Sequence, residues 1–479
     1  MSGIKRHIIE KQFVEFIVKG AGDAFNFRNE LEEVCKNDLI PEIEKLFDSI
    51  APGDKLIRIE NLEIDAGIIA TEKWKTEFIN NVLHDISDKI EILKDSSAVN
   101  TDLSDSVVNE KDSNLGTILF FLENGSLPWY SGIKNSSELS GLIGDFINAG
   151  EEAHFNRLKE LLRLNKRALD RLVSQFDEKE LDSLAEVLFP GKYSLNIPDL
   201  IRTVLNSIET DEGKRKKILY SNWFDTLLNL RTDQNDQLLL KELTQGINMY
   251  LKEEGQPGLI DLFRSELNDQ LRKPKYSYDD IKRIDADLSD KEISEANLKI
   301  QRTGRKSDPD NLSEWYINNC GLVIIHPFLL TLFEKTGYVE NRSWLSKDHQ
   351  QRAIVLCQYL ITGKEEYPEF LLMFNKVLCG YDIFESLSSD IRLSEFEKNE
   401  ASEMLESVTG HWSALKNTTI EGLRETFLKR SGKLSKLNDE WHLKVEEKTA
   451  DILMNKLPWG ISVIKFPWMD RMLKTEWLY

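Results

Sequence analysis

The chain has 479 residues, of which 41% are hydrophobic and 30% charged, and its formal net charge is −20. This length exceeds what one ordinary hydrophobic core serves, so we expect about two to four domains in a folded, soluble protein. The acidic balance argues against general nucleic-acid binding, because Lys and Arg are needed to displace the counterions of the phosphates, and it favours basic partners instead.

Residues 1–94 are predicted to form an N-terminal β-α-β-α domain. The segment IIEKQFVEFIV (residues 8–18) is rich in Ile, Val and Phe, which indicates a strand. In residues 27–50 apolar side chains recur at spacings of three to five, which indicates one helical face. Pro41 lies inside this pattern, so a kink or a break is expected there.

The second half of this domain is expected to repeat the order of strand and helix. In LIRIENLEIDAG (residues 56–67) the apolar residues change parity near Asn61, which predicts a bulge or a turn in the strand. Apolar residues then step by four from Trp74 to Ile90, which predicts an amphipathic helix.

A linker and a helical middle region are predicted next. Residues 95–114 are rich in Ser, Asp and Asn, which is typical of a linker. Residues 115–271 read as helices, and the clearest is FNRLKELLRLNKRALDRLVSQF (residues 155–176), in which five leucines form a stripe.

A second linker, highly charged and low in apolar residues, is predicted at residues 272–312. The C-terminal domain, residues 313–479, begins with helices and ends in short strands. WHLKV (441–445) and LKTEW (473–477) alternate apolar and polar residues with a period of two, and a helix is expected between them at about residues 446–456. The predicted fold class is therefore mainly α, with small α+β domains at both ends, joined by charged flexible linkers.

Compartment signals favour the cytoplasm. The start, MSGIKRHIIEKQF, has no apolar region after its basic residues, unlike a secretory signal. The most apolar stretch, residues 320–333, contains His326 and Pro327 and is shorter than the ~20 residues of a membrane span, so we interpret it as core. The four cysteines form no closely spaced pair, and we expect reduced, buried thiols, although one disulfide among the last three stays open.

Motifs for enzyme chemistry are absent from the sequence. It contains no phosphate-binding GxxxxGK[ST], no GxSxG and no HExxH, and its seven histidines are scattered. GAG at residues 20–22 lacks the third glycine of a dinucleotide fingerprint. We interpret His326 as a hydrogen-bonded core residue. We therefore predict no enzyme, no cofactor and no metal site.

Three apolar-Pro-Trp elements are the remaining candidates for a function. They are Leu127-Pro128-Trp129, Leu457-Pro458-Trp459 and Phe466-Pro467-Trp468, and Met469 follows the last one. The pattern favours core packing, because Trp is mostly buried and Pro fixes the backbone before it. The alternative is a docking surface, since Trp is frequent at interface hot spots. The candidate interaction residues are Trp129, Trp459, Pro467, Trp468 and Met469.

Several segments, in this order along the chain, resemble the contractile injection system tape measure family. The resemblance covers both ends of the chain and the start of its middle, about two-thirds of the sequence, and is weakest across residues 130–312. Its segments are HIIEKQFVEF (7–16), LIRIENLEIDAG (56–67), FLENGSLPW (121–129), NCGLVIIHPFLLTLFEKTG (319–337), LCGYDIFESL (378–387), HWSALKNTTIEGLRETFLKRSGKL (411–434) and WHLKVEEKTADILMNKLPWGISVIKFPWM (441–469).

This resemblance implies a structural assembly protein of a phage-tail-like contractile machine, one that helps to set the length of the inner tube. Implied partners are inner tube, baseplate hub or cap subunits, with self-association left open, and without nucleic acid or a membrane span. The implied location is the cytoplasm during assembly and then the tube lumen or baseplate. A fully helical chain of this size would span ~700 Å, and the sequence predicts two compact ends around a middle that can extend. The alternative is an assembly chaperone or scaffold for tube or baseplate subunits.

Overall fold

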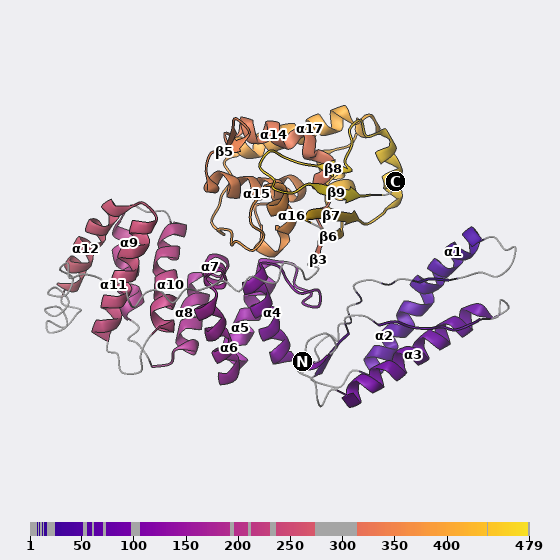
Figure 1. The fold of residues 1–479 in the computed structure, drawn as a ribbon, viewed down its shortest axis with the longest axis horizontal. Helices are drawn as coiled ribbons and strands as arrows, with labels where there is room; N and C mark the ends of the chain where they lie inside the picture. The colour runs from indigo at the N-terminus through magenta and orange to yellow at the C-terminus, as the bar shows by residue number, and fades with distance from the viewer. Residues whose placement is uncertain are drawn as a thin grey trace. The chain divides into compact units, whose positions relative to one another are not determined.

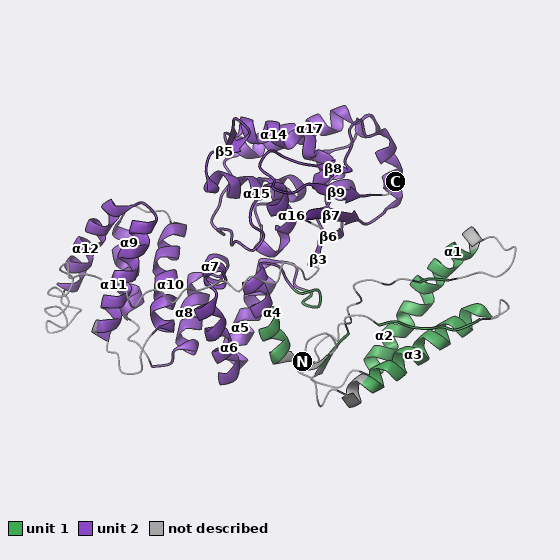
Figure 2. Ribbon diagram, in the orientation of Figure 1, with its two compact units in different colours: residues 1–117, 128–132 green, residues 118–127, 133–479 purple. Residues whose placement is uncertain are grey.

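The fold comes from a computed structural model and is described for most of the chain, in two compact units (Figure 2). Unit 1 comprises residues 1–117 and 128–132, and unit 2 comprises residues 118–127 and 133–479. The described residues are 7, 9, 12, 14–16, 24–50, 55–59, 62–69, 73–96, 106–191, 196–208, 212–229, 236–273, 314–437 and 439–477.

Unit 1 consists of helices and a two-stranded antiparallel sheet in its described part. Helices α2 and α3 pack on each other (Figure 1). The predicted spacing of apolar residues in both helical segments is confirmed, because the buried core consists of Leu31, Val34, Leu39, Ile43, Phe78, Val82, Ile86 and Ile90. The elements are α1 (Ala24–Val34), the π-helical η1 (Cys35–Leu39), α2 (Ile40–Ile50), β1 (Lys55–Arg58), α3 (Trp74–Ser96), β2 (Ser106–Asn109) and α4 (Glu110–Asn124), which continues into unit 2.

The irregularity predicted at Pro41 is a π-helical turn rather than a break. Pro41 has no N–H for the carbonyl of Asn37, and its ring would clash with that carbonyl in a regular α-helix. The preceding turn, Cys35–Leu39, widens instead, and the Ile40 N–H bonds to the Cys35 carbonyl five residues back. The helix therefore continues past the proline.

The predicted strands of unit 1 are found in part. β1 lies in the predicted segment and pairs antiparallel with β2, so that Arg58 is opposite Ser106. β2 and the beginning of α4 occupy the second half of the predicted 95–114 linker. Residues 62–69 form no regular strand. Asn61 and most of the segment 8–18 lie outside the described residues.

The middle of unit 2 is a row of helices, which we call the helical array. Each helix contacts others of the row, but the contacting pairs are not all consecutive in the sequence (Figure 1). Most of the predicted 272–312 linker that follows lies outside the described residues. The array consists of α5 (Ser136–Ala149), α6 (Glu152–Leu164), α7 (Lys166–Gln175), α8 (Glu178–Leu188), α9 (Asn196–Ser207), α10 (Glu212–Leu228), α11 (Asp236–Glu253) and α12 (Pro257–Leu271).

The prediction of a single helix over residues 155–176 is wrong, because the helix is interrupted at Asn165. Asn165 ends α6 and begins α7, and its side-chain oxygen accepts a hydrogen bond from the Ala168 N–H at 3.2 Å. An amide side chain of this kind satisfies a free N–H at a helix start. The leucine stripe runs through the break, since α6 and α7 bury leucines on both sides of it.

The remainder of unit 2, residues 314–477, is a mixed α/β body that we call the C-terminal module. Its five-stranded sheet has the order β3-β6-β7-β9-β8, and only the β7–β9 pair is parallel. Its elements are β3 (Glu314–Ile317), α14 (Leu322–Lys335), β4 (Val339–Glu340), β5 (Ser343–Trp344), α15 (Lys347–Thr362), η3 (Glu369–Leu371), α16 (Met373–Leu378), α17 (Glu395–His411), η4 (Ser413–Leu415), α18 (Ile420–Leu423), η5 (Arg424–Leu428), β6 (Gly432–Leu437), β7 (Glu440–Val445), η6 (Thr449–Lys456), β8 (Val463–Ile464) and β9 (Leu473–Glu476).

The sequence predictions for this module are confirmed in outline. β7 and β9 lie in the two alternating segments, and the helix expected between them is the 3-10 helix η6. The apolar stretch at residues 320–333 lies in α14, which is mostly buried. The mainly α class with a small sheet near the C-terminus is thus correct. Among the described helices, none combines the length and the apolar character needed to cross a bilayer.

Pro327 lies inside α14, and the local structure compensates for its missing N–H. In a regular helix the residue at 327 would donate to the carbonyl of Val323. The ring nitrogen Nδ1 of His326 lies 2.7 Å from that carbonyl oxygen. Burial lowers the pKa of His326, and the bond to Val323 opposes this shift. His326 is therefore hydrogen-bonded, as predicted, but it is half-buried at the border of the core.

Candidate functional site

Trp459 attaches the segment after η6 to helix α14. Its indole Nε1 donates to the Ile324 main-chain oxygen at 2.7 Å, and its ring meets that of Phe328 edge-on, with 5.1 Å between the centroids. The side chain is half-buried and belongs to the border of the module's core.

Trp468 makes an equivalent attachment to helix α16. Its Nε1 donates to the oxygen of Leu378 at 2.9 Å, and its ring stacks on Phe466 with 8° between the planes. Leu378 ends α16, where carbonyls lack partners within the helix. Gly380 follows with a φ of +62°, and a Cβ there would lie 2.4 Å from the Trp468 main-chain oxygen. Only glycine fits this close approach.

The other candidate interaction residues differ in exposure. Pro467 is exposed, whereas Met469 is buried and its sulfur accepts a hydrogen bond from the Phe466 N–H at 3.4 Å. Trp129 belongs to unit 1, is 37% exposed, and meets the Tyr130 ring edge-on at 5.7 Å. The structure thus brings Trp459, Trp468 and Met469 into the C-terminal module and leaves Trp129 outside it. A partner for any of them stays a prediction.

A buried ion pair, which the sequence analysis missed, fixes the last strand. Arg430 and Asp451 have side-chain exposures of 0% and 4%, and their charged atoms lie 2.8 Å apart. Asp451 also accepts hydrogen bonds from the Trp477 indole at 3.0 Å and from the Lys448 N–H at 2.8 Å. One carboxylate therefore holds β9, η6 and the end of η5 together.

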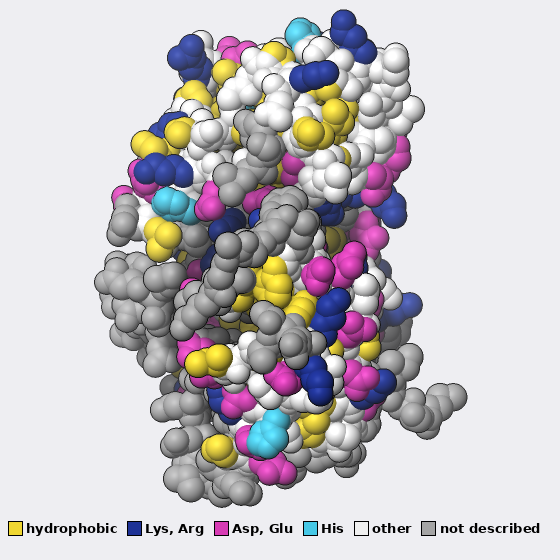
Figure 3. Space-filling view, turned by 90° about the vertical axis from the view of Figure 1, so that its right-hand side faces the viewer, with side chains coloured by type: hydrophobic (Ala, Val, Ile, Leu, Met, Phe, Trp, Pro, Cys, Tyr) yellow, Lys and Arg dark blue, Asp and Glu magenta, His cyan; other side chains and the backbone are white. Residues whose placement is uncertain are grey.

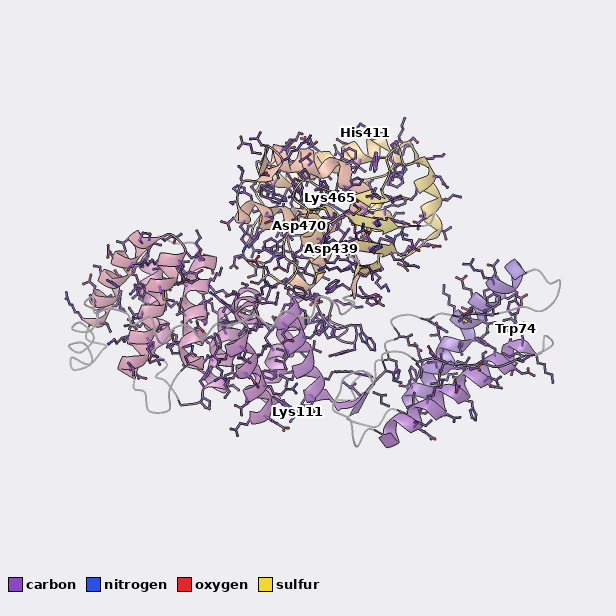
Figure 4. The ribbon with its side chains drawn as sticks, in the orientation of Figure 1. Trp74, Lys111, His411, Asp439, Lys465 and Asp470 are labelled. Atoms are coloured by element: carbon purple, nitrogen blue, oxygen red, sulfur yellow. The ribbon has the colours of Figure 1, made fainter. Side chains whose placement is uncertain are left out.

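Three exposed charged side chains lie in the loops next to β7, β8 and β9. They are Lys465, Asp470 and Asp439, which Figure 4 labels in the C-terminal module. Lys465 Nζ donates to the Asp470 main-chain oxygen at 2.6 Å, and Asp439 pairs with Arg471. On the face drawn in Figure 3, acidic and basic side chains are interspersed. That face therefore shows no large patch of a single charge sign.

A second buried group of charges joins the helical array to the C-terminal module. Arg171 of α7, Glu369 of η3 and Lys376 of α16 have side-chain exposures of 0%, 0% and 1%. Arg171 Nε lies 3.1 Å and Lys376 Nζ 2.6 Å from Glu369 Oε1. Burial lowers the pKa of Lys376, and the Glu369 carboxylate opposes this shift.

Main-chain oxygens complete the shell around these charges. Arg171 donates to the oxygens of Leu122 and, at 2.7 Å, Phe384. Lys376 Nζ donates to the oxygens of Ile383 at 3.2 Å and Glu385 at 2.7 Å. Two of the segments that carry the family resemblance, FLENGSLPW and LCGYDIFESL, therefore meet at Arg171.

Gly125 of the first segment allows this approach. Its φ is +71°, and a Cβ there would lie 2.7 Å from Glu369 Oε1 and 2.9 Å from Arg171 Nη2. The sequence did contain a signal for the group. Glu369 and Lys376 are charged residues on either side of the apolar run FLLMF. Arg171 lies between Leu169 and Leu172 of the leucine stripe.

A third charged group lies at the start of α17. Arg352 holds the Glu397 carboxylate with two bonds of 2.7 and 2.6 Å, and Tyr338 donates to the same carboxylate. Burial raises the pKa of Glu397, but the hydrogen bonds from Arg352, Tyr338 and Ser394 outweigh it and the net shift is downward.

The described cysteines are free thiols. All four cysteines are free, and Cys35 is only half-buried, unlike the buried thiols expected. Burial raises the pKa of Cys320 and Cys379, which keeps both as thiols. Within the described ranges, no three His, Cys, Asp or Glu side chains are grouped so as to hold a metal ion.

Comparison with known proteins agrees with the resemblance of the sequence segments. Residues 6–477 match a family model described as contractile injection system tape measure protein, which covers nearly the whole chain. No curated protein and no solved structure matches it.

Proposed function

We propose, because the chain belongs to the contractile injection system tape measure protein family, that it acts in particle assembly and limits the length of the inner tube. Its partners in this role are tube, baseplate hub or cap subunits. It acts first in the cytoplasm and then within the particle. The role is structural and needs no catalytic step.

The helical array is the observation that supports a length function. Its helices pack against one another, with neighbours that are not always consecutive in the sequence, since α12 contacts α9 and α5 contacts α8 (Figure 1). Packed helices are spaced by about 8–10 Å, so the length of such a row grows with the number of helices. A row of packed helices can therefore set a length while it stays folded. The length that each residue adds to the row is smaller than the rise per residue of a continuous helix.

Inserting one helix pair between α9 and α10 tests this proposal. About 30 added residues would lengthen a folded row by about 10–20 Å, a continuous helix by ~45 Å, and an extended chain by up to ~100 Å. Tube lengths would be measured on electron micrographs of purified particles. An unchanged length distribution contradicts the length function.

The β4–β5 turn provides a control for this insertion. Asn341 and Arg342 form the turn between these two-residue strands, outside the array. A 30-residue insertion there enlarges the protein without adding to the row, so the tube length should stay as in the wild type. If both insertions lengthen the tube equally, the array is not the measure.

An assembly scaffold or chaperone is the second candidate. The buried charges around Arg171 favour it, because they join the array to the C-terminal module and keep both folded. A chaperone that departs is missing from mature particles. Quantitative mass spectrometry of purified particles therefore separates the two functions: a fixed copy number per particle supports the length function, and absence supports the chaperone.

A further inference from the structure

The contacts around Arg171 connect three separate parts of unit 2. Arg171 belongs to α7 of the array, Leu122 to the end of α4, and Glu369 and Phe384 to the C-terminal module. Arg171 and Glu369 are 198 residues apart in the sequence. The planar guanidinium donates to Glu369, Leu122 and Phe384 through three different nitrogens held in a fixed fork.

Further contacts surround the buried charges. The Phe121 and Phe370 rings meet edge-on with 6.3 Å between their centroids. The Gln175 side chain both donates and accepts a hydrogen bond. Its Nε2 donates to the Leu387 oxygen at 2.9 Å, and its Oε1 accepts from the Glu369 N–H at 3.3 Å. We call these contacts, together with Arg171, Glu369 and Lys376, the junction.

Opening the junction is unfavourable in free energy. Arg171 and Lys376 are both cationic, and Glu369 is the carboxylate between them. Withdrawing Arg171 removes donors from the Leu122 and Phe384 carbonyls and leaves their oxygens buried and unpaired. Glu369 keeps its pair with Lys376 when Arg171 withdraws, so the cost of opening comes from these unpaired oxygens and from the lost bond of Arg171 to Glu369.

We propose that the junction makes the helical array and the C-terminal module one cooperatively folding body, with Arg171 as the positioning residue that must withdraw before the two separate. This inference is independent of the tube-length proposal, and it concerns how the chain moves. While the junction is closed, α7 cannot leave the C-terminal module. Separation of the array from the module at α7 therefore begins with the release of Arg171.

Hydrogen exchange on the full chain tests the inference with a matched pair of variants. Arg171→Met removes the buried guanidinium. Arg167→Met lies one turn earlier on α7 and removes an exposed pair with Asp382, whose charged atoms are 2.9 Å apart. We expect Arg171→Met to speed exchange at least about thirtyfold both in α7 and in residues 369–387, because two carbonyl oxygens lose their donor. Arg167→Met should change both by less than about threefold.

Two outcomes would overturn the inference. One is faster exchange in α7 alone, with residues 369–387 as protected as in the wild type. The other is an equal effect of both variants.

A wild-type measurement covers the case in which Arg171→Met does not fold. In a urea series followed by hydrogen exchange, array and module peptides should lose protection at the same urea concentration. Loss at clearly separate concentrations overturns the inference, whichever part unfolds first.

Discussion

The buried pair of Arg430 and Asp451 gives the sharpest stability prediction. Asp451→Asn keeps the size of the side chain and removes its charge. Arg430 then stays buried with only two main-chain acceptors, the oxygens of Glu446 at 3.0 Å and Thr426 at 2.7 Å. The amide oxygen has two lone pairs, so in the place of Oδ2 it can still accept from both Trp477 and Lys448, and the amide nitrogen then faces Arg430.

The size of the effect follows from burial. Removing one partner of a buried ion pair costs about 3–5 kcal/mol. The low end applies here because Arg430 keeps its two carbonyl partners, so we expect a loss of about 3 kcal/mol in the free energy of unfolding of the C-terminal module.

Urea denaturation of the full chain, with hydrogen exchange of peptides from β7 and β9 as the local readout, measures this loss. Asp439→Asn is the control, because Asp439 also pairs with an arginine, Arg471, but is 78% exposed. An exposed pair contributes less than about 1 kcal/mol. A loss below about 1 kcal/mol for Asp451→Asn, equal to that of the control, would refute the reasoning.

Four further predictions concern single positions. The lowered pKa of Glu397 means that its contribution to stability is present above its usual value of 4.5 and is lost as the pH falls; Glu397→Gln should flatten this part of a pH–stability profile, and an unchanged slope contradicts it. Asn165→Ala should cost about 1 kcal/mol through the lost helix cap, measured by urea denaturation, and a neutral effect would show that the cap is not stabilising. Trp468→Phe should destabilise the module by about 1 kcal/mol or more through the lost bond to Leu378. Pro467→Ala, at an exposed site, should leave stability unchanged, so a loss of particle assembly in Pro467→Ala alone would mark a partner surface.

The sequence predicts those elements whose signal is local. The helices of unit 1 follow from apolar spacing, and β7 and β9 follow from period-two alternation, because both patterns depend on neighbouring residues. The parallel pairing of β7 with β9 could not be predicted in this way. Trp441 and Leu473, which stand opposite each other, are separated by η6, β8 and three loops.

The features that the sequence did not predict have two physical causes, a weak local signal and long-range pairing. Asn165 breaks a helix whose leucine stripe is continuous, and a single capping residue is a weak signal beside such a stripe. Arg171, Glu369 and Lys376 are charged residues within apolar sequence, which indicates burial with a partner. Which charge pairs with which depends on contacts across many residues, and the sequence of one chain does not encode these in any local pattern.

The apolar-Pro-Trp elements acquire a defined structural role from their acceptors. In each of the last two elements, the indole donates to a carbonyl of a helix: Trp459 to α14 and Trp468 to the end of α16. The prolines before them lie on the outside, since Pro458 and Pro467 are exposed. The indoles thus fix the exposed turns against the core. A partner that binds this end of the chain would meet those turns first, so a structural role of the tryptophans and an interaction role of the prolines are compatible on one segment.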